Sequence, residues 1–316
     1  MTEESSHFGK GVGSLAVASL FIGSTNVVFG NVVQNIQPIV LTFLAFTISA
    51  LIFGVANRGN LPSLDKAALG AIIGLNFASA GVFLFLYTGL KYLEPAIASA
   101  LQAGATPLFT IVVLSLLDRT RRVSGAEVAG AGSILLGSIM LAWVSFSGRS
   151  GLAALPVGNV VLGIAAVTAS GLSTVFLTLL SRKLTRHGWS NLNILGHRCY
   201  VTVIGCGLFS LQANQDWSAV GDTAGVVGLF AILGLTIPLV LLQIGIRNVP
   251  PFVVLAMTNL NPILTYALQL LDQRLSTSLY TLCGIVIVLG GVLWVIYSQS
   301  RPVPAPAPAQ PDKAPD

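Results

Sequence analysis

Long runs of apolar residues, separated by short polar connections, dominate the chain. Strands of a membrane barrel would alternate apolar and polar residues, whereas unbroken apolar runs of about 20 residues are typical of membrane-spanning helices. Ten such runs are present, at roughly residues 12–31, 36–56, 68–90, 95–117, 124–146, 157–181, 192–213, 222–246, 250–271 and 276–298. Because lipid cannot satisfy backbone polar groups, this pattern predicts an all-α integral membrane protein with ten transmembrane helices.

The composition excludes the main soluble classes. Of 316 residues, 16 are basic and 11 acidic, so that 9% are charged and 54% are hydrophobic. A soluble domain carries about 25% charged residues, and the mean hydropathy here is +0.83. A cytosolic enzyme, a nucleic-acid-binding protein and a disordered chain are therefore all disfavoured, and we expect a lipid bilayer but no nucleic acid as a partner.

Basic residues are distributed unevenly between the two sides that ten crossings define. If the N-terminus is cytoplasmic, three fall outside: Lys91, Arg149 and Arg274. Twelve fall inside: Lys10, Arg58, Lys66, Arg119, Arg121, Arg122, Arg182, Lys183, Arg186, Arg247, Arg301 and Lys313. Because short cytoplasmic loops carry the excess of Lys and Arg, both termini are predicted to be cytoplasmic. Arg198 is left within a span.

Ordered similarities between the two halves of the chain indicate an internal repeat. Gly89-Leu90-Lys91 matches Gly245-Ile246-Arg247, and Leu116-Leu117-Asp118 matches Leu270-Leu271-Asp272. Pro95 and Pro107 correspond to Pro250 or Pro251 and to Pro262. Each half would hold five helices, an odd number, so the second copy would enter the membrane from the opposite side. Many secondary transporters are inverted repeats of this kind; a duplicated scaffold without transport is the alternative.

The resulting organisation has four parts. We expect a cytoplasmic N-terminus at 1–11, a first five-helix repeat at 12–146, a second at 157–298 and a disordered Pro/Ala-rich tail at 302–316.

The residues that carry the repeat also carry a family resemblance. Pro95-Ala96, Pro107 and Asp118, with Pro250-Pro251, Pro262 and Asp272 as the second copy, resemble the drug/metabolite transporter superfamily in its ten-helix EamA-type branch. The resemblance implies a transporter, and the chain looks most like bacterial exporters of amino acids, aromatic ones included. The closing acid is usually Glu in the family but Asp here. A basic residue early in the second helix of each half is also usual; Arg198 fits in the second half and the first half has no counterpart.

Polar side chains within spans are costly in lipid and usually face a bundle interior or a cavity. Those that recur at mid-depth are candidates for a substrate cavity, although Ser and Thr can equally bond to their own helix. Two aromatic residues could add apolar lining, although packing in the core or against lipid is the alternative. The candidate cavity residues are Asn26, Asn76, Phe77, Tyr87, Ser99, Gln102, His197, Arg198, Gln243 and Asn259.

Two further features concern the helices themselves. A proline inside a helix removes one backbone hydrogen bond, so Pro107 and Pro262 are candidates for a pair of hinges, with static kinks as the alternative. Small residues spaced four apart allow helices to approach closely. They predict a packing seam on the fifth span along Gly125, Ala129, Ser133 and Gly137.

Ionisable residues bear on energetics and substrate. Asp and Glu are absent from mid-span positions, and Glu94, Asp118, Glu127 and Asp272 are expected to reach water at helix ends. This favours facilitated diffusion, with His197 as the remaining candidate for proton coupling. Arg198 could pair with a substrate carboxylate or extend to the interface as an anchor. Because a phosphate carrier would need several cations, neutral or zwitterionic solutes are favoured.

The sequence thus predicts a monomeric exporter of amino acids in a bacterial inner membrane, working by alternating access. Export of another metabolite or a drug-like solute, coupling to protons, and a channel remain alternatives. Motifs for metal, nucleophile or nucleotide chemistry are not found, so neither an enzyme nor a metal or cofactor site is expected.

Overall fold

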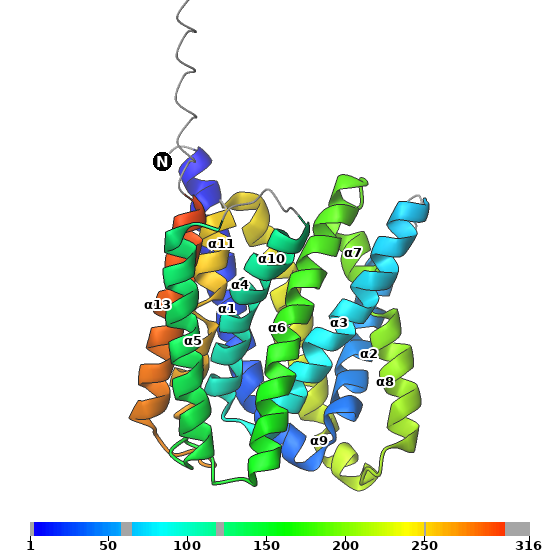
Figure 1. The fold of residues 1–316 in the computed structure, drawn as a ribbon. Coiled ribbons are helices and arrows are strands. Elements are labelled where there is room, and N and C mark those ends of the chain that lie inside the picture. The colour runs from blue at the N-terminus through cyan, green and yellow to red at the C-terminus, as the bar shows by residue number, and fades with distance from the viewer. Residues whose placement is uncertain (1–2, 58–64, 118–122, 250, 301–316) are drawn as a thin grey trace, which may run out of the picture.

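The computed structural model is a bundle of helices that run along one common direction (Figure 1). It describes residues 3–57, 65–117, 123–249 and 251–300, and within these ranges it contains no strand. The tail predicted at 302–316 and Asp118 lie outside the described residues.

The first five predicted spans are each one continuous helix. Local sequence explains several of their starts: Asp65 accepts a hydrogen bond from the Ala68 amide (2.6 Å), and Ser124 and Glu127 form a reciprocal capping box. Pro38 and Pro95 occupy the first helical positions, where a missing N–H costs nothing. The helices are α1 (Glu3–Asn35), α2 (Pro38–Ala56), α3 (Lys66–Tyr92), α4 (Pro95–Leu117) and α5 (Gly125–Phe146).

The second half is less regular, because its seventh, eighth and ninth predicted spans are each interrupted. The seventh breaks at Arg198–Cys199, the eighth contains a π-helical segment, and the ninth breaks at Asn259–Leu260. The elements are α6 (Val157–Arg186), α7 (Asn191–His197), α8 (Tyr200–Gln212), α9 (Trp217–Phe230), η1 (Ala231–Thr236), α10 (Ile237–Asn248), α11 (Pro251–Thr258), α12 (Asn261–Gln269) and α13 (Leu279–Ser300).

Nine segments of the described chain are long and apolar enough to cross a membrane. The predicted ninth span, residues 250–271, is not among them because α11 and α12 are each shorter than a span. The two short helices together occupy the place of the predicted ninth crossing, which leaves the ten-segment outline intact.

The two halves run in opposite senses. Helix α1 begins at the end of the bundle where α6 finishes, and the first helices of the halves are therefore antiparallel (Figure 1). The ends of α3 and α5, with the α12–α13 connection, share the opposite end, called here the outer end. Lys91, Arg149 and Arg274 lie there, while Lys10 and Lys66 lie at the other end, called here the inner end. The two names follow the orientation that the charge pattern predicts.

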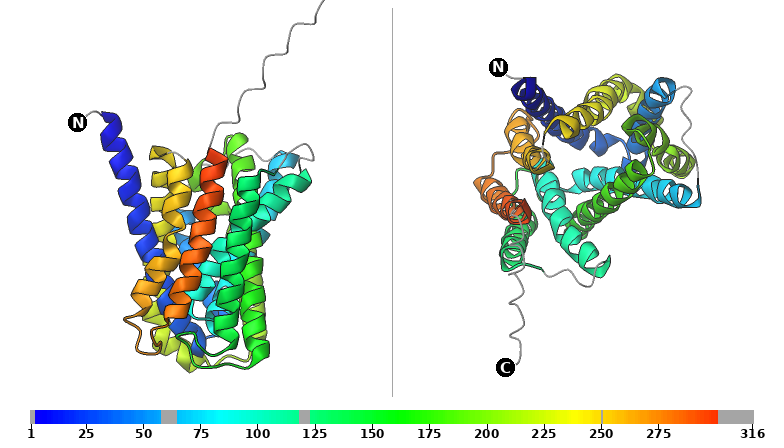
Figure 2. Two further views of the ribbon diagram at one scale, coloured as in Figure 1. Left: turned by 60° about the vertical axis from the view of Figure 1, so that its left-hand side comes forward. Right: turned by 90° about the horizontal axis from the view of Figure 1, so that it is seen from above.

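Helices α5 and α13 form a close pair at one side of the bundle, away from α2, α3, α7 and α8 (Figure 2). Gly130 and Gly137 on α5 face α13, where a Cβ atom at Gly137 would lie 2.7 Å from the backbone nitrogen of Val288. Of the seam predicted along Gly125, Ala129, Ser133 and Gly137, the last two lie against α13, where Ser133 donates a hydrogen bond to the Ile287 carbonyl. Gly125 and Ala129 are exposed, so that part of the prediction is wrong. From Gly137 the observed seam continues toward the start of α5 through the buried residues Ile134 and Gly130.

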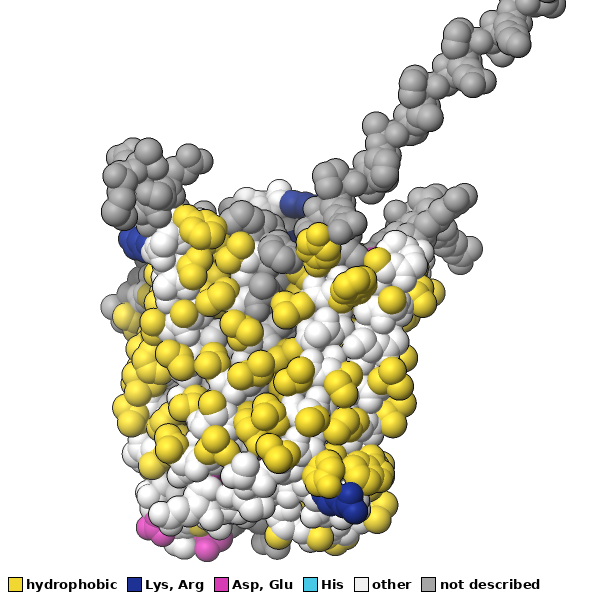
Figure 3. All heavy atoms as spheres, turned by 90° about the vertical axis from the view of Figure 1, so that its left-hand side faces the viewer, with side chains coloured by type: hydrophobic (Ala, Val, Ile, Leu, Met, Phe, Trp, Pro, Cys, Tyr) yellow, Lys and Arg dark blue, Asp and Glu magenta, His cyan; other side chains and the backbone are white. Residues whose placement is uncertain are grey.

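The surface matches a lipid environment. Large apolar side chains cover the middle of the face formed by α1, α5, α11 and α13, and charged side chains gather toward the ends (Figure 3). Leu136 is 67% exposed and Ile139 65% exposed on α5. In water such a surface would aggregate, whereas in a bilayer it is solvated by acyl chains.

Candidate functional site

A polar cluster surrounds the interruption between α7 and α8. Asn76, on α3, donates a hydrogen bond to the carbonyl oxygen of His197 (2.8 Å) and accepts one from the amide of Val201 (3.2 Å). The break frees backbone groups that lipid cannot satisfy. The buried amide of Asn76 takes the place of the missing helical partners and ties the two short helices to α3.

His197 lies at the last position of α7, near the inner end. Its Nδ1 is 2.6 Å from the hydroxyl of Tyr200, and its Nε2 is 3.3 Å from the side-chain nitrogen of Asn57. The Trp189 ring meets the imidazole edge-on at 5.7 Å. Because Asn57 directly follows α2, the histidine joins α2 to the interrupted seventh span.

Arg198 is the residue left outside both helices at this break. Its side chain is only 5% exposed, and its Nε and Nη2 atoms have no hydrogen-bond partner. An interfacial anchor would extend to the surface, so that interpretation is wrong. A buried guanidinium is instead presented to the interior, where it is costly unless an anion compensates it.

A second polar link crosses the bundle at mid-depth. Gln102 on α4 donates to the hydroxyl of Ser170 on α6 (2.7 Å), and that hydroxyl donates to the carbonyl oxygen of Val82 on α3 (2.6 Å). Ser99, one turn before Gln102, is buried beside it on α4. Gln102 and Ser170 thus join three helices through hydrogen bonds within the protein.

A third link involves the interrupted ninth span. Asn26 on α1 is buried, and its amide nitrogen lies 3.5 Å from the hydroxyl of Thr265 on α12. Asn259 occupies the turn between α11 and α12 and is half-buried. The side chain of Gln243 lies outside the described part of the structure.

The two aromatic cavity candidates, Tyr87 and Phe77, lie in different environments. Tyr87 is 3% exposed and packs edge-on against Phe29, with ring centroids 5.3 Å apart, so it belongs to the core. Phe77 is 64% exposed and continues a stripe with Leu69 and Ile73 on the outer face of α3. The expectation that Phe77 lines a cavity is therefore wrong: its helix presents Asn76 inward and Phe77 to lipid.

The two prolines are not equivalent in the structure. Pro107 lies inside the continuous helix α4, where it removes one helical bond. Pro262 lies in the first turn of α12, directly after a break, where a missing N–H is tolerated. The prediction of a matched pair of mid-helix hinges is therefore wrong. Pro107 is a mid-helix proline, whereas Pro262 follows an interruption.

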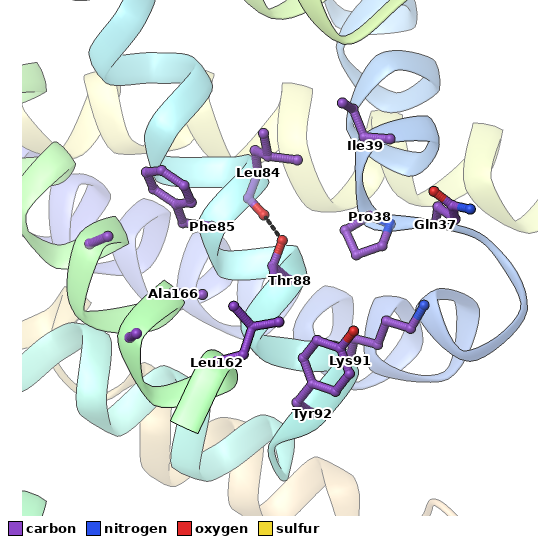
Figure 4. Close-up of a pocket in the computed structure, with 12 residues that line it drawn as sticks. Gln37, Pro38, Ile39, Leu84, Phe85, Thr88, Lys91, Tyr92, Leu162 and Ala166 are labelled. Atoms are coloured by element: carbon purple, nitrogen blue, oxygen red, sulfur yellow. Dashed lines mark hydrogen bonds between the residues drawn. The ribbon is translucent and has the colours of Figure 1, made fainter. Parts of the chain in front are cut away.

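A groove of about 520 Å³ opens between α2, α3 and α6 toward the outer end (Figure 4). Lys91 and Gln37 lie at one side of it, and Leu84 and Phe85 at the other. Its lining is mostly apolar and includes none of the ten predicted cavity residues. The lining residues are Gln37, Pro38, Ile39, Leu84, Phe85, Thr88, Lys91, Tyr92, Leu162, Ala165, Ala166 and Ala169.

Glu94, in the connection between α3 and α4, forms a network that sequence reasoning missed. It is 1% exposed and accepts hydrogen bonds from the Gly151 amide (2.7 Å), the Thr281 hydroxyl (2.9 Å) and the Gln269 amide nitrogen. The expectation that Glu94 reaches water is wrong. The same expectation is wrong for Glu127, which is 5% exposed and held in its capping box.

Burial and hydrogen bonding act on Glu94 in opposite directions. Desolvation raises the pKa of the carboxyl above its ordinary value, while the three donated hydrogen bonds lower it, and desolvation is the larger effect. The network joins the first repeat to α12 and α13 of the second, so the protonation of one carboxyl bears on contacts between the repeats.

A neighbouring link reinforces the outer end. Asn31, near the end of α1, donates to the Asp272 carboxylate (2.9 Å), and Arg274 donates to the carbonyl oxygen of Gly30 (3.0 Å). Arg274 and Asp272 also approach within 3.7 Å. Burial lowers the pKa of Arg274. Together with Glu94, these residues connect α1 and the α3–α4 turn with the second repeat.

Comparison with known proteins decides the family. The model of the EamA-like transporter family matches twice, at residues 9–143 and 160–297. The chain belongs to this family. It is thus a membrane transporter of the drug/metabolite transporter superfamily, and the two matches correspond to the two repeats.

The fold of this chain also occurs among solved structures. One, titled only "Crystal structure of protein", superposes with a TM-score of 0.62 at 21% identity, covering 89% of this chain and 95% of that chain. At this identity the likeness concerns the fold alone. The comparison with curated proteins gave no match.

Within the EamA-like fold, the candidates form separate links and do not converge on one open cavity. Asn76, His197 and Arg198 meet at the α7–α8 break, Gln102 and Ser99 lie on α4, and Asn26 faces α12. Groups of three metal-ligating side chains are absent from the described residues. The family points to transport of a small molecule, not to catalysis.

Proposed function

We propose that this transporter exports neutral or zwitterionic amino acids, aromatic ones included, across a bacterial inner membrane by alternating access. It would act as a monomer with both termini in the cytoplasm. The observation that carries the proposal is the set of three interruptions in consecutive spans of the second repeat, at Arg198–Cys199, in η1 and at Asn259–Leu260. Discontinuous helices at membrane depth are tolerated where they line a pathway or are buried in protein.

The interruptions meet polar side chains from the first repeat. Asn76 contacts the first, Ser49 bonds the Thr236 hydroxyl of η1 (2.8 Å), and Asn26 reaches Thr265 beyond the third. Each irregular segment is thus opposed by a regular helix of the other copy. This arrangement supports rocking of one repeat against the other around sites at the interruptions.

The charges inside the bundle support the substrate class. Among described residues, Arg198 is the one buried basic side chain within a span. A phosphorylated solute would call for several cations. One guanidinium surrounded by amides and hydroxyls suits a solute with a single carboxylate and no phosphate.

The positions of the Asp and Glu residues bear on whether transport is coupled to protons. The described spans contain no buried Asp or Glu at mid-depth, since Glu94 lies in a connection and Glu127 in the first turn of α5. Facilitated diffusion down the gradient of the substrate is therefore proposed. In proteoliposomes, flux should be nearly equal with and without an imposed pH gradient; strong acceleration by the gradient would contradict this.

The test of the function is transport by purified protein in proteoliposomes, across labelled amino acids, sugar phosphates and cationic dyes. Saturable flux with counterflow, confined to amino acids, is expected. Transport confined to phosphorylated compounds or dyes would overturn the substrate class. Flux without saturation or counterflow would indicate a channel.

A further inference from the structure

The guanidinium of Arg198 is buried without a compensating anion. Its side chain is 5% exposed, and two of its nitrogen atoms lack any hydrogen-bond partner. Transfer of an unpaired charge from water to a low-dielectric interior is among the most costly steps in folding. Ionisable residues within membrane spans usually face a bundle interior or a cavity and mark substrate or ion pathways.

The described carboxylates do not pair with Arg198, and Asp222 is exposed on α9. Asp65 caps α3, Glu94 and Glu127 are held in their own networks, and Asp272 binds Asn31 and lies close to Arg274. Asp216 caps α9, where its two hydrogen bonds to Ser218 lower its pKa. Among described residues, no carboxylate forms an ion pair with Arg198, and the side-chain interaction it does make is with the adjacent thiol of Cys199. The anion must therefore come from outside this part of the chain.

The free atoms indicate the shape of that anion. They are Nε and Nη2, which lie on one edge of the planar guanidinium and present two N–H bonds in parallel. This edge fits the two oxygen atoms of a carboxylate in a bidentate pair. A hydroxyl or a carbonyl group would satisfy only one of them.

Other unpartnered groups lie on the adjoining turns. The hydroxyls of Ser79 and Thr202 are completely buried and have no hydrogen-bond partner. Ser79 follows Asn76 by one helical turn on the same face of α3, and Thr202 adjoins Val201, to which Asn76 is bonded. Hydroxyls can donate as well as accept, so both add donors near the break.

We propose that Arg198 is the carboxylate-binding residue of the transport site, pairing through Nε and Nη2, with the hydroxyls of Ser79 and Thr202 beside it. The assignment rests on the proposed amino-acid export and deepens it. The recognised group is a monocarboxylate, and the α7–α8 break positions the guanidinium that binds it.

The test measures recognition of the carboxylate itself. Counterflow of labelled L-phenylalanine is competed by unlabelled L-phenylalanine or by L-phenylalaninamide, which lacks the negative charge. The wild-type protein should prefer the acid by at least about tenfold. Arg198→Gln should abolish this preference, and Arg198→Lys should retain part of it, because an ammonium keeps the charge but loses the bidentate geometry.

Controls separate the possible failures. Arg182→Gln, an exposed basic residue at the inner end, should keep the preference. If Arg198→Gln does not fold, Arg198→Lys and Thr202→Val are measured in its place. The readout is the ratio of competition by the acid to competition by the amide, which does not depend on protein yield. Wild-type protein that carries no amino acid would overturn the proposed function. Transport with an acid preference that survives Arg198→Gln would overturn this inference and leave the function standing.

Discussion

At the scale of single residues, buried amides and one carboxyl connect helices that are distant in sequence. Asn76 joins α3 to the interrupted seventh span, and Glu94 joins the α3–α4 connection to α12 and α13. Each side chain satisfies backbone or side-chain groups that would otherwise be buried without partners. Removing either one should therefore cost more than the loss of one hydrogen bond, because its partners cannot reach water.

Asn76→Ala should destabilise the protein by roughly 2–4 kcal/mol, since it leaves the His197 carbonyl and the Val201 amide unsatisfied. Thermal unfolding in detergent measures the change. Asn248→Ala is the matched control, because the Asn248 amide bonds to Ile244 within its own helix; a shift under about 1 kcal/mol is expected. Equal destabilisation by both variants would show that Asn76 does not support the break.

Glu94→Gln should change how stability depends on pH. Because burial raises the folded-state pKa of Glu94 above its ordinary value, the native state holds the proton more tightly than the unfolded chain. The resulting stabilisation is complete below the unfolded pKa and is lost as pH rises through the folded pKa. Wild-type melting temperature should therefore fall over this interval, and the variant, which cannot titrate there, should not show that fall.

The control for this titration is Asp216→Asn, which removes an exposed carboxylate whose pKa is lowered by its hydrogen bonds to Ser218. Its contribution has the opposite sign, being lost as pH falls. The downward trend with rising pH should therefore persist in Asp216→Asn. The same trend in Glu94→Gln would show that another group is responsible.

At the scale of elements, the apolar runs predicted where helices lie but not where they break. Runs of this length allow few structures in lipid, so the second to sixth spans appeared within about five residues of their expected bounds. The first helix begins at Glu3, well before the expected residue 12, and takes in most of the predicted N-terminal segment 1–11. The breaks at Arg198 and Asn259 fall inside equally apolar stretches. The polar residues at these breaks are predicted as cavity lining. At the first break, the side chain that bonds the freed backbone groups, Asn76, lies on another helix.

The same limit explains the errors over side chains. Asn76 and Phe77 are neighbours, yet one faces the bundle and the other lipid. Lipid and protein interior are both apolar, so hydrophobicity does not separate the two faces of a helix. Small residues mislead similarly on α5, where the buried seam runs through Gly130 and not through Ala129.

Gly137→Ala should test the α5–α13 seam. The added Cβ would lie 2.7 Å from the Val288 nitrogen and 3.1 Å from the Gly284 oxygen, so the two backbones must separate. A loss of about 1–3 kcal/mol is expected. Gly132→Ala, on the same helix with no atom within 4 Å, should be neutral or gain up to about 1 kcal/mol. Melting temperatures that do not differ between the two would reject the seam.

At the scale of the molecule, the outer end is held together by bonds between the repeats. Asn31 pairs with Asp272, Arg274 with the Gly30 carbonyl, and Glu94 with Gln269 and Thr281. An outward-open state of the proposed cycle must separate some of these residues. Alternating access therefore predicts that the outer end opens and closes in each cycle.

A reversible crosslink across that end should stop transport. In a Cys283→Ser background, which removes the exposed native thiol, Asn31→Cys and Asp272→Cys are joined by a short bis-methanethiosulfonate reagent. The side chains they replace lie 2.9 Å apart. Amino-acid counterflow should fall by at least about tenfold on crosslinking, because the conformational step that opens the outer end is blocked. Counterflow should return after reduction of the crosslink.

The α5–α13 seam provides the comparison, because it also joins the two repeats but lies away from the outer-end network. Ser133 donates to the backbone carbonyl oxygen of Ile287 at 3.1 Å, so Ser133→Cys with Ile287→Cys places one thiol on each of the two facing helix turns. If rocking pivots on this seam, transport persists when it is crosslinked. Loss of transport in both variants would mean that any link between the repeats is inhibitory, and persistence in both would contradict opening at the outer end. The selective loss at Asn31 and Asp272 is the result that alternating access requires.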